Sequence, residues 1–279
     1  KVPIIYRTCE LTNWKGGNTY QKFLEFNPEK RYDVLVLGSS HAYRGYDPRI
    51  FKSHGLEMFN LGTSAQSALN SYFVAKDYIK PGKVGLVILD VFDGALMSDG
   101  LESASDLIAN LPGDNNVMDM AVACRDPRML NLLTLRWLDR GNEPLYKDST
   151  YIAKGFSQNT DSLKHKPSYK NYYKDKEPEK RQLYFLSKIL AYFSSNKIPC
   201  IMTNYPLPKE WDRKGHARFA REIKRLAREW NTDFFDFSGD LDLHPIHHYY
   251  DAHHLNQAGV NIYNLFLLEQ LKKNRIIHE

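Results

Sequence analysis

Cysteine is scarce in this sequence, and long apolar runs are missing. The three cysteines, Cys9, Cys124 and Cys200, lie far apart among 279 residues. Their odd number and wide spacing exclude a fully paired disulfide framework and a CxxC metal knuckle. We expect Cys200, which falls in an apolar run, to be an unreactive core residue. No stretch approaches the roughly 20 consecutive apolar residues that span a bilayer, so no membrane-spanning helix is expected in this chain.

A large excess of charge of either sign is also missing. The formal net charge is +5, and lysine and arginine are dispersed along the chain. This pattern does not indicate nucleic-acid binding, so we predict no nucleic-acid partner. The hydrophobic fraction of 42% and the charged fraction of 25% are typical of a globular protein. The length suits one large domain, with or without an insertion.

Five short apolar runs show little alternation, which is typical of parallel strands buried on both faces. They cover residues 33–38, 56–61, 84–90, 198–204 and 232–237. Helical spacing of apolar residues occurs at 179–196, 215–230 and 257–273, and Asp47 followed by Pro48 is typical of a helix start. Strands that alternate with helices predict a doubly wound sheet.

We therefore predict a single α/β domain over residues 1–279. The expected fold is a three-layer α/β/α sandwich with a parallel, flavodoxin-like sheet of about five strands. The interval 96–177 is too long for one crossover and includes a weakly periodic tract rich in lysine and tyrosine at 146–176. We interpret it as an insertion between strands 3 and 4. It forms either a lid or substrate-contacting wall, or a surface elaboration without direct chemistry.

Three turns at strand or helix ends contain residues suited to acyl chemistry. The first, GSSH at 38–41, follows the first strand at the carboxyl edge, where α/β sheets bind ligands. The second, NLG at 60–62, contains a glycine whose N–H could face an oxyanion. In the third, Asp251 precedes His254 by three residues and could fix the tautomer of that imidazole. Each turn alone also has a purely structural interpretation, because serines satisfy strand-end amides and glycines make turns.

Taken together, the turns supply the parts of a nucleophilic serine site. A neutral serine needs a positioned base and donors for the oxyanion. His254 could serve as that base and Asp251 as its orienting carboxylate. Asn256 is then expected to cap the last helix, which its apolar positions anchor to the sheet: Val260, Tyr263, Leu267, Leu268 and Leu271.

The order GSS, NLG and DxxH before the last helix resembles the SGNH (GDSL-type) hydrolases, and these blocks are spread over nearly the whole core. The resemblance implies that Ser40 is the nucleophile, because it is the third residue of the G-[DS]-S turn. It also implies an oxyanion hole formed by the N–H groups of Ser40 and Gly62. The predicted catalytic residues are thus Ser40, His254 and Asp251.

The stretch GSSHAYRGYDP is similar to the exported branch of this family, which includes teichoic acid D-alanyl transfer proteins and alginate O-acetylation proteins. That similarity implies a cell-envelope substrate and a location outside the cytoplasmic membrane, with a membrane anchor beyond the given chain as an option. A chain that begins at Lys1 agrees with a removed signal peptide or anchor, and equally with any other chain boundary.

One block departs from the family. Its oxyanion asparagine normally follows the third strand in a GxND turn, where this chain has LDVFDG at 89–94. A carboxylate cannot stabilise an oxyanion unless it is protonated. Asn204, at the end of the fourth strand on the same sheet edge, is the substitute donor that we consider. Loss of one donor typically costs about 100- to 1,000-fold in rate.

A histidine-rich stretch before the last helix suggests a metal site as an alternative. Its members are His244, His247, His248, Asp251, His253 and His254. Their spacing matches neither HxxxH nor HExxH on a helix, so we predict no metal and no cofactor. His41 and Arg44 adjoin the serine turn and are expected either to contact substrate or to orient the loop.

We predict a serine esterase that removes acetyl or other short acyl groups from an acylated carbohydrate or a small ester. Two alternatives remain open. An O-acyltransferase acting on a cell-envelope polysaccharide would form the same acyl-serine. A non-catalytic glycan-binding module with a vestigial triad could use the tyrosines at 169, 172 and 173 to stack on sugar rings, although such tyrosines more often pack in the core. The sequence does not indicate an oligomeric state.

Overall fold

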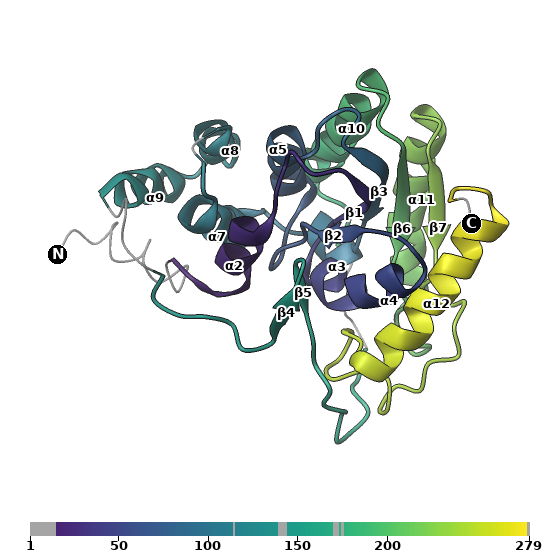
Figure 1. Ribbon diagram of the computed structural model, residues 1–279. Coiled ribbons are helices and arrows are strands. Elements are labelled where there is room, and N and C mark those ends of the chain that lie inside the picture. The colour runs from purple at the N-terminus through teal and green to yellow at the C-terminus, as the bar shows by residue number, and fades with distance from the viewer. Residues whose placement is uncertain (1–14, 114, 139–143, 170–172, 174–175, 278–279) are drawn as a thin grey trace.

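A parallel β-sheet forms the centre of the computed structural model, which describes residues 15–113, 115–138, 144–169, 173 and 176–277 (Figure 1). Its five strands lie in the order β2-β1-β3-β6-β7, and each neighbouring pair is parallel. Their bounds are β1 Tyr32–Leu37, β2 Met58–Asn60, β3 Val84–Asp90, β6 Cys200–Asn204 and β7 Asp233–Asp236. This is the strand order of flavodoxin-like folds, so the predicted fold class is confirmed.

Helices cover both faces of the sheet and complete three layers (Figure 1). One face packs against α3 Ser40–Gly45, α4 Pro48–Ser53 and α12 Gln257–Lys273. The other packs against α5 Ala68–Tyr78, α10 Lys180–Ser195 and α11 Arg213–Glu229. Residues of β1 alternate between the two cores, with Val34 and Val36 on the first side and Leu35 and Leu37 on the second. The strand is therefore buried on both faces, as its apolar run indicates.

Three strands are shorter than predicted, and β7 lacks one predicted residue at each end. β2 is an edge strand of the sheet and pairs with β1 at three positions only, so the run 56–61 forms a strand only at Met58–Asn60. β6 begins at Cys200, two residues later than predicted, because Pro199 has no N–H to donate. The Pro199 carbonyl still accepts a hydrogen bond from the Val87 amide at 2.8 Å.

The last helix has the predicted bounds. The side chain of Asn256 accepts a hydrogen bond from the Gly259 amide at 3.1 Å and caps α12, as expected. The five predicted anchor positions of α12 are all buried. The Asp47 side chain likewise caps α4, accepting from the Arg49 amide at 2.9 Å. None of the described helices combines the length and the apolar character that a bilayer crossing needs.

The chain between β3 and α10 forms several helices and a hairpin. Its elements are α6 Asp93–Leu96, α7 Leu101–Asn110, α8 Val117–Ala123, α9 Pro127–Leu138 and a hairpin of β4 Tyr151–Ala153 and β5 Phe156–Ser157. The N-terminal helix α2 Gly17–Glu25 packs against α7. Among the described residues, this region forms no strand of the central sheet.

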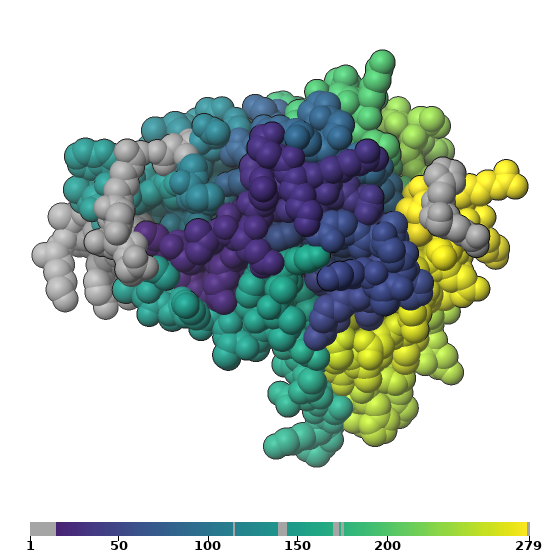
Figure 2. All heavy atoms as spheres, viewed as in Figure 1, coloured from purple at the N-terminus to yellow at the C-terminus, as the bar shows by residue number. Residues whose placement is uncertain are grey.

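The hairpin lies against the edge of β2 and next to α3. The Asn60 amide donates to the Lys154 carbonyl at 2.9 Å. Gly155 has a φ of +82°, and a β-carbon there would lie 1.8 Å from the Asn60 carbonyl oxygen, so only glycine permits this approach. The teal surface around the hairpin adjoins the dark blue surface of α3 and α4 (Figure 2). The insertion therefore reaches the neighbourhood of Ser40.

Candidate active site

The turn after β1 presents the Ser40 hydroxyl at the carboxyl edge of the sheet. Gly38 has a φ of +149°, and a β-carbon there would lie 2.8 Å from Asp90 Cβ, so the turn requires glycine. The Ser39 side chain accepts a hydrogen bond from the His41 amide at 3.4 Å and caps α3. Ser40 is the first residue of α3, so its N–H has no partner within the helix. Ser39 is thus structural, and Ser40 is available for chemistry.

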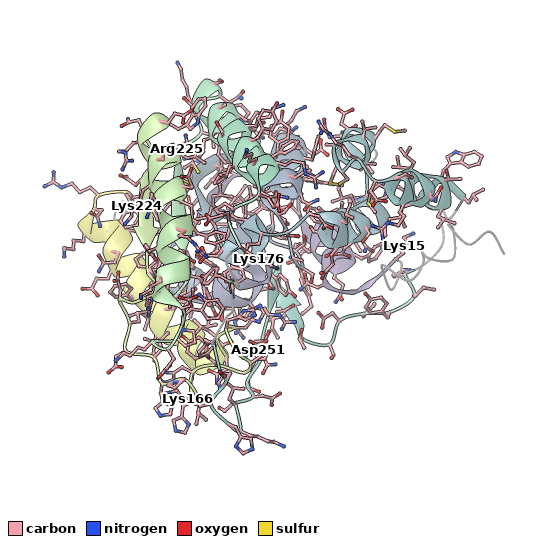
Figure 3. The ribbon with its side chains drawn as sticks, turned by 180° about the vertical axis from the view of Figure 1, so that it is seen from behind. Lys15, Lys166, Lys176, Lys224, Arg225 and Asp251 are labelled. Atoms are coloured by element: carbon pink, nitrogen blue, oxygen red, sulfur yellow. The ribbon has the colours of Figure 1, made fainter. Side chains whose placement is uncertain are left out.

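Ser40, His254 and Asp251 form a continuous hydrogen-bonded chain. Ser40 Oγ lies 2.7 Å from His254 Nε2, although 214 residues separate them in sequence. His254 Nδ1 lies 2.7 Å from Asp251 Oδ2. Asp251 and His254 come from the loop before α12, and Figure 3 shows Asp251 near the N-terminal end of that helix. The structure therefore brings the three predicted catalytic residues together in the predicted order.

Asp251 is held as a carboxylate. Its Oδ1 accepts hydrogen bonds from the His253 and His254 amides at 3.0 and 2.8 Å. Partial burial opposes ionisation, but the hydrogen bond and charge of His254, together with these amides, lower the pKa of Asp251 below its ordinary range. An ionised Asp251 accepts a hydrogen bond from the Nδ1–H of His254 and leaves Nε2 free to accept the serine proton. The hydrogen bond to Asp251 therefore fixes this tautomer, and the His254 side chain is only 12% exposed.

Two predicted oxyanion donors have other partners, which corrects the sequence-based site. Gly62 does lie against the serine turn, since a β-carbon there would be 2.9 Å from the Gly38 carbonyl oxygen. Its amide, however, donates to the Asn60 side-chain oxygen at 3.0 Å. The Asn204 amide nitrogen lies 3.4 Å from both ring nitrogens of His216, so it faces that ring and not Ser40. The Ser40 N–H is the one predicted donor without a partner among the described residues.

Asn60 is a positioning residue that the sequence analysis did not single out. It is fully buried, and its Nδ2 donates to the Ala42 carbonyl at 2.7 Å and the Tyr46 carbonyl at 3.4 Å. Because its Oδ1 holds the Gly62 amide, Asn60 joins the serine helix α3 to the loop after β2. Its only signal in the sequence is its place at a strand end, directly before Leu61 and Gly62.

Two further histidines, His41 and His253, lie beside the triad. The ring nitrogens of His41, His253 and His254 lie within 4.8 Å of one another, a spacing that could hold a metal ion. His254, however, already uses Nδ1 for Asp251 and Nε2 for Ser40. Metal binding through His254 would disrupt the triad, so the two uses of this imidazole exclude each other.

The remaining histidines of the predicted cluster lie elsewhere. The His244 amide donates to His248 Nδ1 at 2.9 Å, and the rings of His244 and His247 lie 4.4 Å apart. These contacts are confined to the loop before Tyr249. Within the described residues, none of these three joins the triad.

A second polar cluster was missed by the sequence analysis. His216 of α11 is buried, with Nδ1 2.7 Å from Asp93 Oδ2 and Nε2 3.0 Å from Asp236 Oδ2. Although burial alone would lower it, hydrogen bonds to Asp236 and Asp93 raise the pKa of His216 to about 9. The Tyr173 hydroxyl donates to Asp93 as well. The cluster connects the ends of β3 and β7 to α11 and to the insertion.

The tyrosines proposed for sugar stacking are packing residues where they are described. Tyr169 and Tyr173 are 6% and 1% exposed. The Tyr169 hydroxyl donates to the Ala252 carbonyl at 2.7 Å, beside the triad loop. Tyr172 lies outside the described residues. Tyr169 and Tyr173 therefore form no exposed aromatic surface that could stack on sugar rings.

The cysteines described by the structure are free thiols. Burial raises the pKa of Cys124 to about 12 and raises the pKa of Cys200 further still. Both therefore stay protonated and unreactive at neutral pH, as expected for Cys200. Cys9 lies outside the described residues.

No family model matches the sequence, and no curated protein matches it. Among solved structures, an acetyl xylan esterase is similar with a TM-score of 0.45 and 13% identity, over 86% of this chain and 99% of that chain. A lipase/acylhydrolase from Enterococcus faecalis has a TM-score of 0.42 and 12% identity, over 87% and 96%. A GDSL-like lipase from Bacteroides thetaiotaomicron has a TM-score of 0.45 and 13% identity, over 87% and 89%. At these identities the similarity concerns the fold, and the chemistry has to be inferred from the site.

Proposed function

We propose that the protein is a serine ester hydrolase that acts through an acyl-serine intermediate. The observation that carries this proposal is the unbroken chain from Ser40 Oγ through the His254 imidazole to the Asp251 carboxylate, with both contacts at 2.7 Å. Each contact has the length and the order that activation of a serine needs.

Acylation begins when Ser40 Oγ attacks the ester carbonyl and its proton passes to His254 Nε2. Asp251 stabilises the imidazolium that forms. The Ser40 N–H, at the start of α3, is oriented by the turn to donate to the developing oxyanion. The tetrahedral intermediate collapses as the alcohol oxygen leaves with the proton from Nε2. This step yields the acyl-serine and a neutral His254.

Deacylation uses the same groups with water as the nucleophile. His254 Nε2 takes a proton from the water, whose oxygen attacks the acyl carbon. The bond to Ser40 Oγ then breaks, and the serine recovers its proton from the imidazolium. If a sugar hydroxyl replaced water, the product would be a new ester, so transfer and hydrolysis differ only in this second half-reaction.

For the substrate we propose a short-chain acyl ester of a carbohydrate, and for the location a site outside the cytoplasmic membrane. Both rest on the similarity of GSSHAYRGYDP to the exported branch of the SGNH hydrolases. Fractionation of the native host followed by immunoblotting tests the location. Recovery of the protein in the cytoplasmic fraction alone would contradict export.

A fluorophosphonate probe tests the nucleophile. We expect the probe to label the wild-type protein at Ser40, as identified by peptide mass spectrometry, and to leave Ser40→Ala unlabelled. Ser39→Ala is the matched control, because Ser39 caps α3 through its side chain and should not react. Labelling of folded Ser40→Ala at the wild-type rate would refute the assignment.

Product analysis separates the two outcomes of the acyl-serine. An O-acetylated oligosaccharide is incubated with the protein, with and without an excess of a non-acetylated acceptor, and the products are identified by mass spectrometry. Release of free acetate in both reactions is the expected result. Acetylated acceptor without free acetate would identify an O-acyltransferase instead.

A further inference from the structure

The positively charged guanidinium of Arg44 lies close to the candidate nucleophile Ser40. Ser40 and Arg44 are four residues apart on α3, so they lie on the same side of that helix. The Arg44 guanidinium lies 5.0 Å from the centre of the Tyr43 ring and 5.4 Å from that of Tyr250, and its Nε donates to the Tyr43 hydroxyl at 3.3 Å. Tyr250 also stacks on His254, with ring centroids 5.6 Å apart and an interplanar angle of 12°. Two tyrosines thus fix the cation beside the triad.

No carboxylate forms an ion pair with Arg44 in the part of the chain that the structure describes. Its two terminal nitrogens make no hydrogen bond there. Nearby Asp148 accepts hydrogen bonds from the Thr150 amide and hydroxyl at 2.8 and 2.7 Å, and Asp251 is occupied by His254. Asp148 attracts the half-buried guanidinium electrostatically, but no carboxylate bonds to its terminal nitrogens, so an anion that reaches them gains charge-assisted hydrogen bonds.

Arg49 shows the opposite arrangement five residues later. Its guanidinium pairs with the buried Asp47 carboxylate at 2.6 Å, so its charge is neutralised within the protein. Of these two arginines, only Arg44 keeps its planar pair of donors free of a carboxylate, so only Arg44 can offer that pair to a ligand. This contrast makes Arg49 a suitable control position.

A second basic group lies behind Tyr43. Lys22 is fully buried, its Nζ donates to the Gly62 carbonyl, and it lies 4.8 Å from the centre of the Tyr43 ring. Burial lowers the pKa of Lys22 to about 7, so it carries a partial positive charge at neutral pH. Lys22 therefore adds positive charge behind the serine turn, partly offset by Asp106 and Asp148, and no carboxylate forms an ion pair with Lys22 in the described residues.

We infer that Arg44 is a specificity-determining residue that binds an anionic group of the substrate, a carboxylate or a phosphate. This inference deepens the proposed function and rests on it. Arg44 is about one helical turn from Ser40, so an anion bound by its guanidinium lies near the ester carbonyl that Ser40 attacks. Its planar donor pair matches two oxygens of either anion. The favoured substrate class is thus an ester that carries a negative charge near the scissile bond.

Four small esters test the charge preference in the purified full chain. Phenyl acetate is neutral, 4-acetoxybenzoate carries a carboxylate in its alcohol part, 4-acetoxyphenyl phosphate carries a phosphate there, and phenyl hydrogen succinate carries a carboxylate in its acyl part. We measure kcat/KM for each and form its ratio to the value for phenyl acetate. The wild-type ratio should exceed one for at least one anionic ester. The ester with the highest ratio shows whether the site prefers a carboxylate or a phosphate.

Arg44→Gln should lower that ratio by about 10- to 100-fold, because a charge-assisted contact is lost. Arg44→Lys should restore part of it, and Arg49→Gln should leave the ratio at the wild-type value. An equal loss on neutral and anionic esters in Arg44→Gln would overturn the inference, as would a wild-type enzyme that hydrolyses phenyl acetate without any anionic preference.

A binding measurement separates this inference from the proposed function. If the wild-type protein hydrolyses none of the esters, the proposed function fails. Isothermal titration of 4-acetoxybenzoate and 4-acetoxyphenyl phosphate into Ser40→Ala and into Ser40→Ala/Arg44→Gln then still tests the anion site. Tighter binding to the protein that keeps Arg44 supports the site, and equal binding refutes it.

Discussion

His253 Nδ1 lies 2.9 Å from His41 Nε2, so the two histidines that adjoin the catalytic residues in sequence bind each other. His41 is fully buried between Tyr205 and Phe92. Burial, followed by the charge of nearby His254, lowers the pKa of His253 to about 4 and the pKa of His41 well below its ordinary value. Both rings are therefore neutral at neutral pH and do not compete with His254 for Asp251.

This pair predicts a loss of stability in acid. In the unfolded chain His253 has the ordinary histidine pKa of ~6.5. Because its pKa in the folded protein is about 4, the unfolded state binds more protons between these values, and the free energy of unfolding falls as the pH drops. Urea unfolding followed by circular dichroism at pH 7 and pH 4.5 measures the loss. Between pH 7 and pH 4.5 the free energy of unfolding should fall less in His253→Gln than in the wild type. An equally large fall would assign the effect to other groups.

Asp251→Asn should reduce kcat strongly while the protein stays folded. An amide lacks the negative charge of a carboxylate and its NH2 group can donate to Nδ1, so His254 loses its tautomer and its imidazolium is no longer stabilised. We expect kcat on phenyl acetate to fall by about 100- to 10,000-fold, with a much smaller change in KM. Asp242→Asn is the control, since Asp242 is exposed and pairs with Lys209. A loss smaller than tenfold would show that Asp251 has no essential role.

Asn60→Ala should destabilise the protein through the serine turn. The change leaves the Gly62 amide and the Ala42 carbonyl without their buried partner, which typically costs about 1–3 kcal/mol in the free energy of unfolding. Denaturant unfolding measures this cost, and the rate of fluorophosphonate labelling reports the position of Ser40. Asn274→Ala removes only an exposed contact to the Gln270 carbonyl and should change neither quantity. An unchanged labelling rate in Asn60→Ala would contradict a positioning role.

His216→Ala should be the most destabilising of these substitutions. It leaves two carboxylates, Asp93 and Asp236, near each other without the imidazolium, and breaking a buried pair typically costs about 3–5 kcal/mol. The pKa of His216 in the folded protein is raised to about 9, so its contribution is complete below the unfolded pKa of ~6.5 and is lost as the pH rises through 9. The wild type should therefore lose stability between pH 7 and pH 10.

Unfolding curves of the wild type and of His216→Ala at pH 7 and pH 10 measure both the cost of the substitution and the alkaline loss of stability. His216→Ala should lack the alkaline loss that the wild type shows. His54→Ala is the control, because His54 is exposed and hydrogen-bonds only within its own helix end. Equal slopes in the wild type and His216→Ala would show that another group titrates in this range.

The sequence by itself determined the elements whose pattern is local. Continuous apolar runs located all five strands of the sheet, and the cap at Asn256 with helical spacing after it located α12. The order of the three turns, through its resemblance to the SGNH hydrolases, also predicted Ser40, His254 and Asp251 as a triad, and the structure brings these side chains together.

Only the tertiary structure decided which polar groups meet. Gly62 matches the family's oxyanion glycine and Asn204 is the substitute donor considered, yet the Gly62 amide donates to Asn60 and the Asn204 amide faces His216. Asp93 and His216 are 123 residues apart, and no spacing rule connects them. A side-chain hydrogen bond depends on rotamers and on the approach of loops that are distant in sequence, whereas strand and helix patterns depend on neighbours a few residues away.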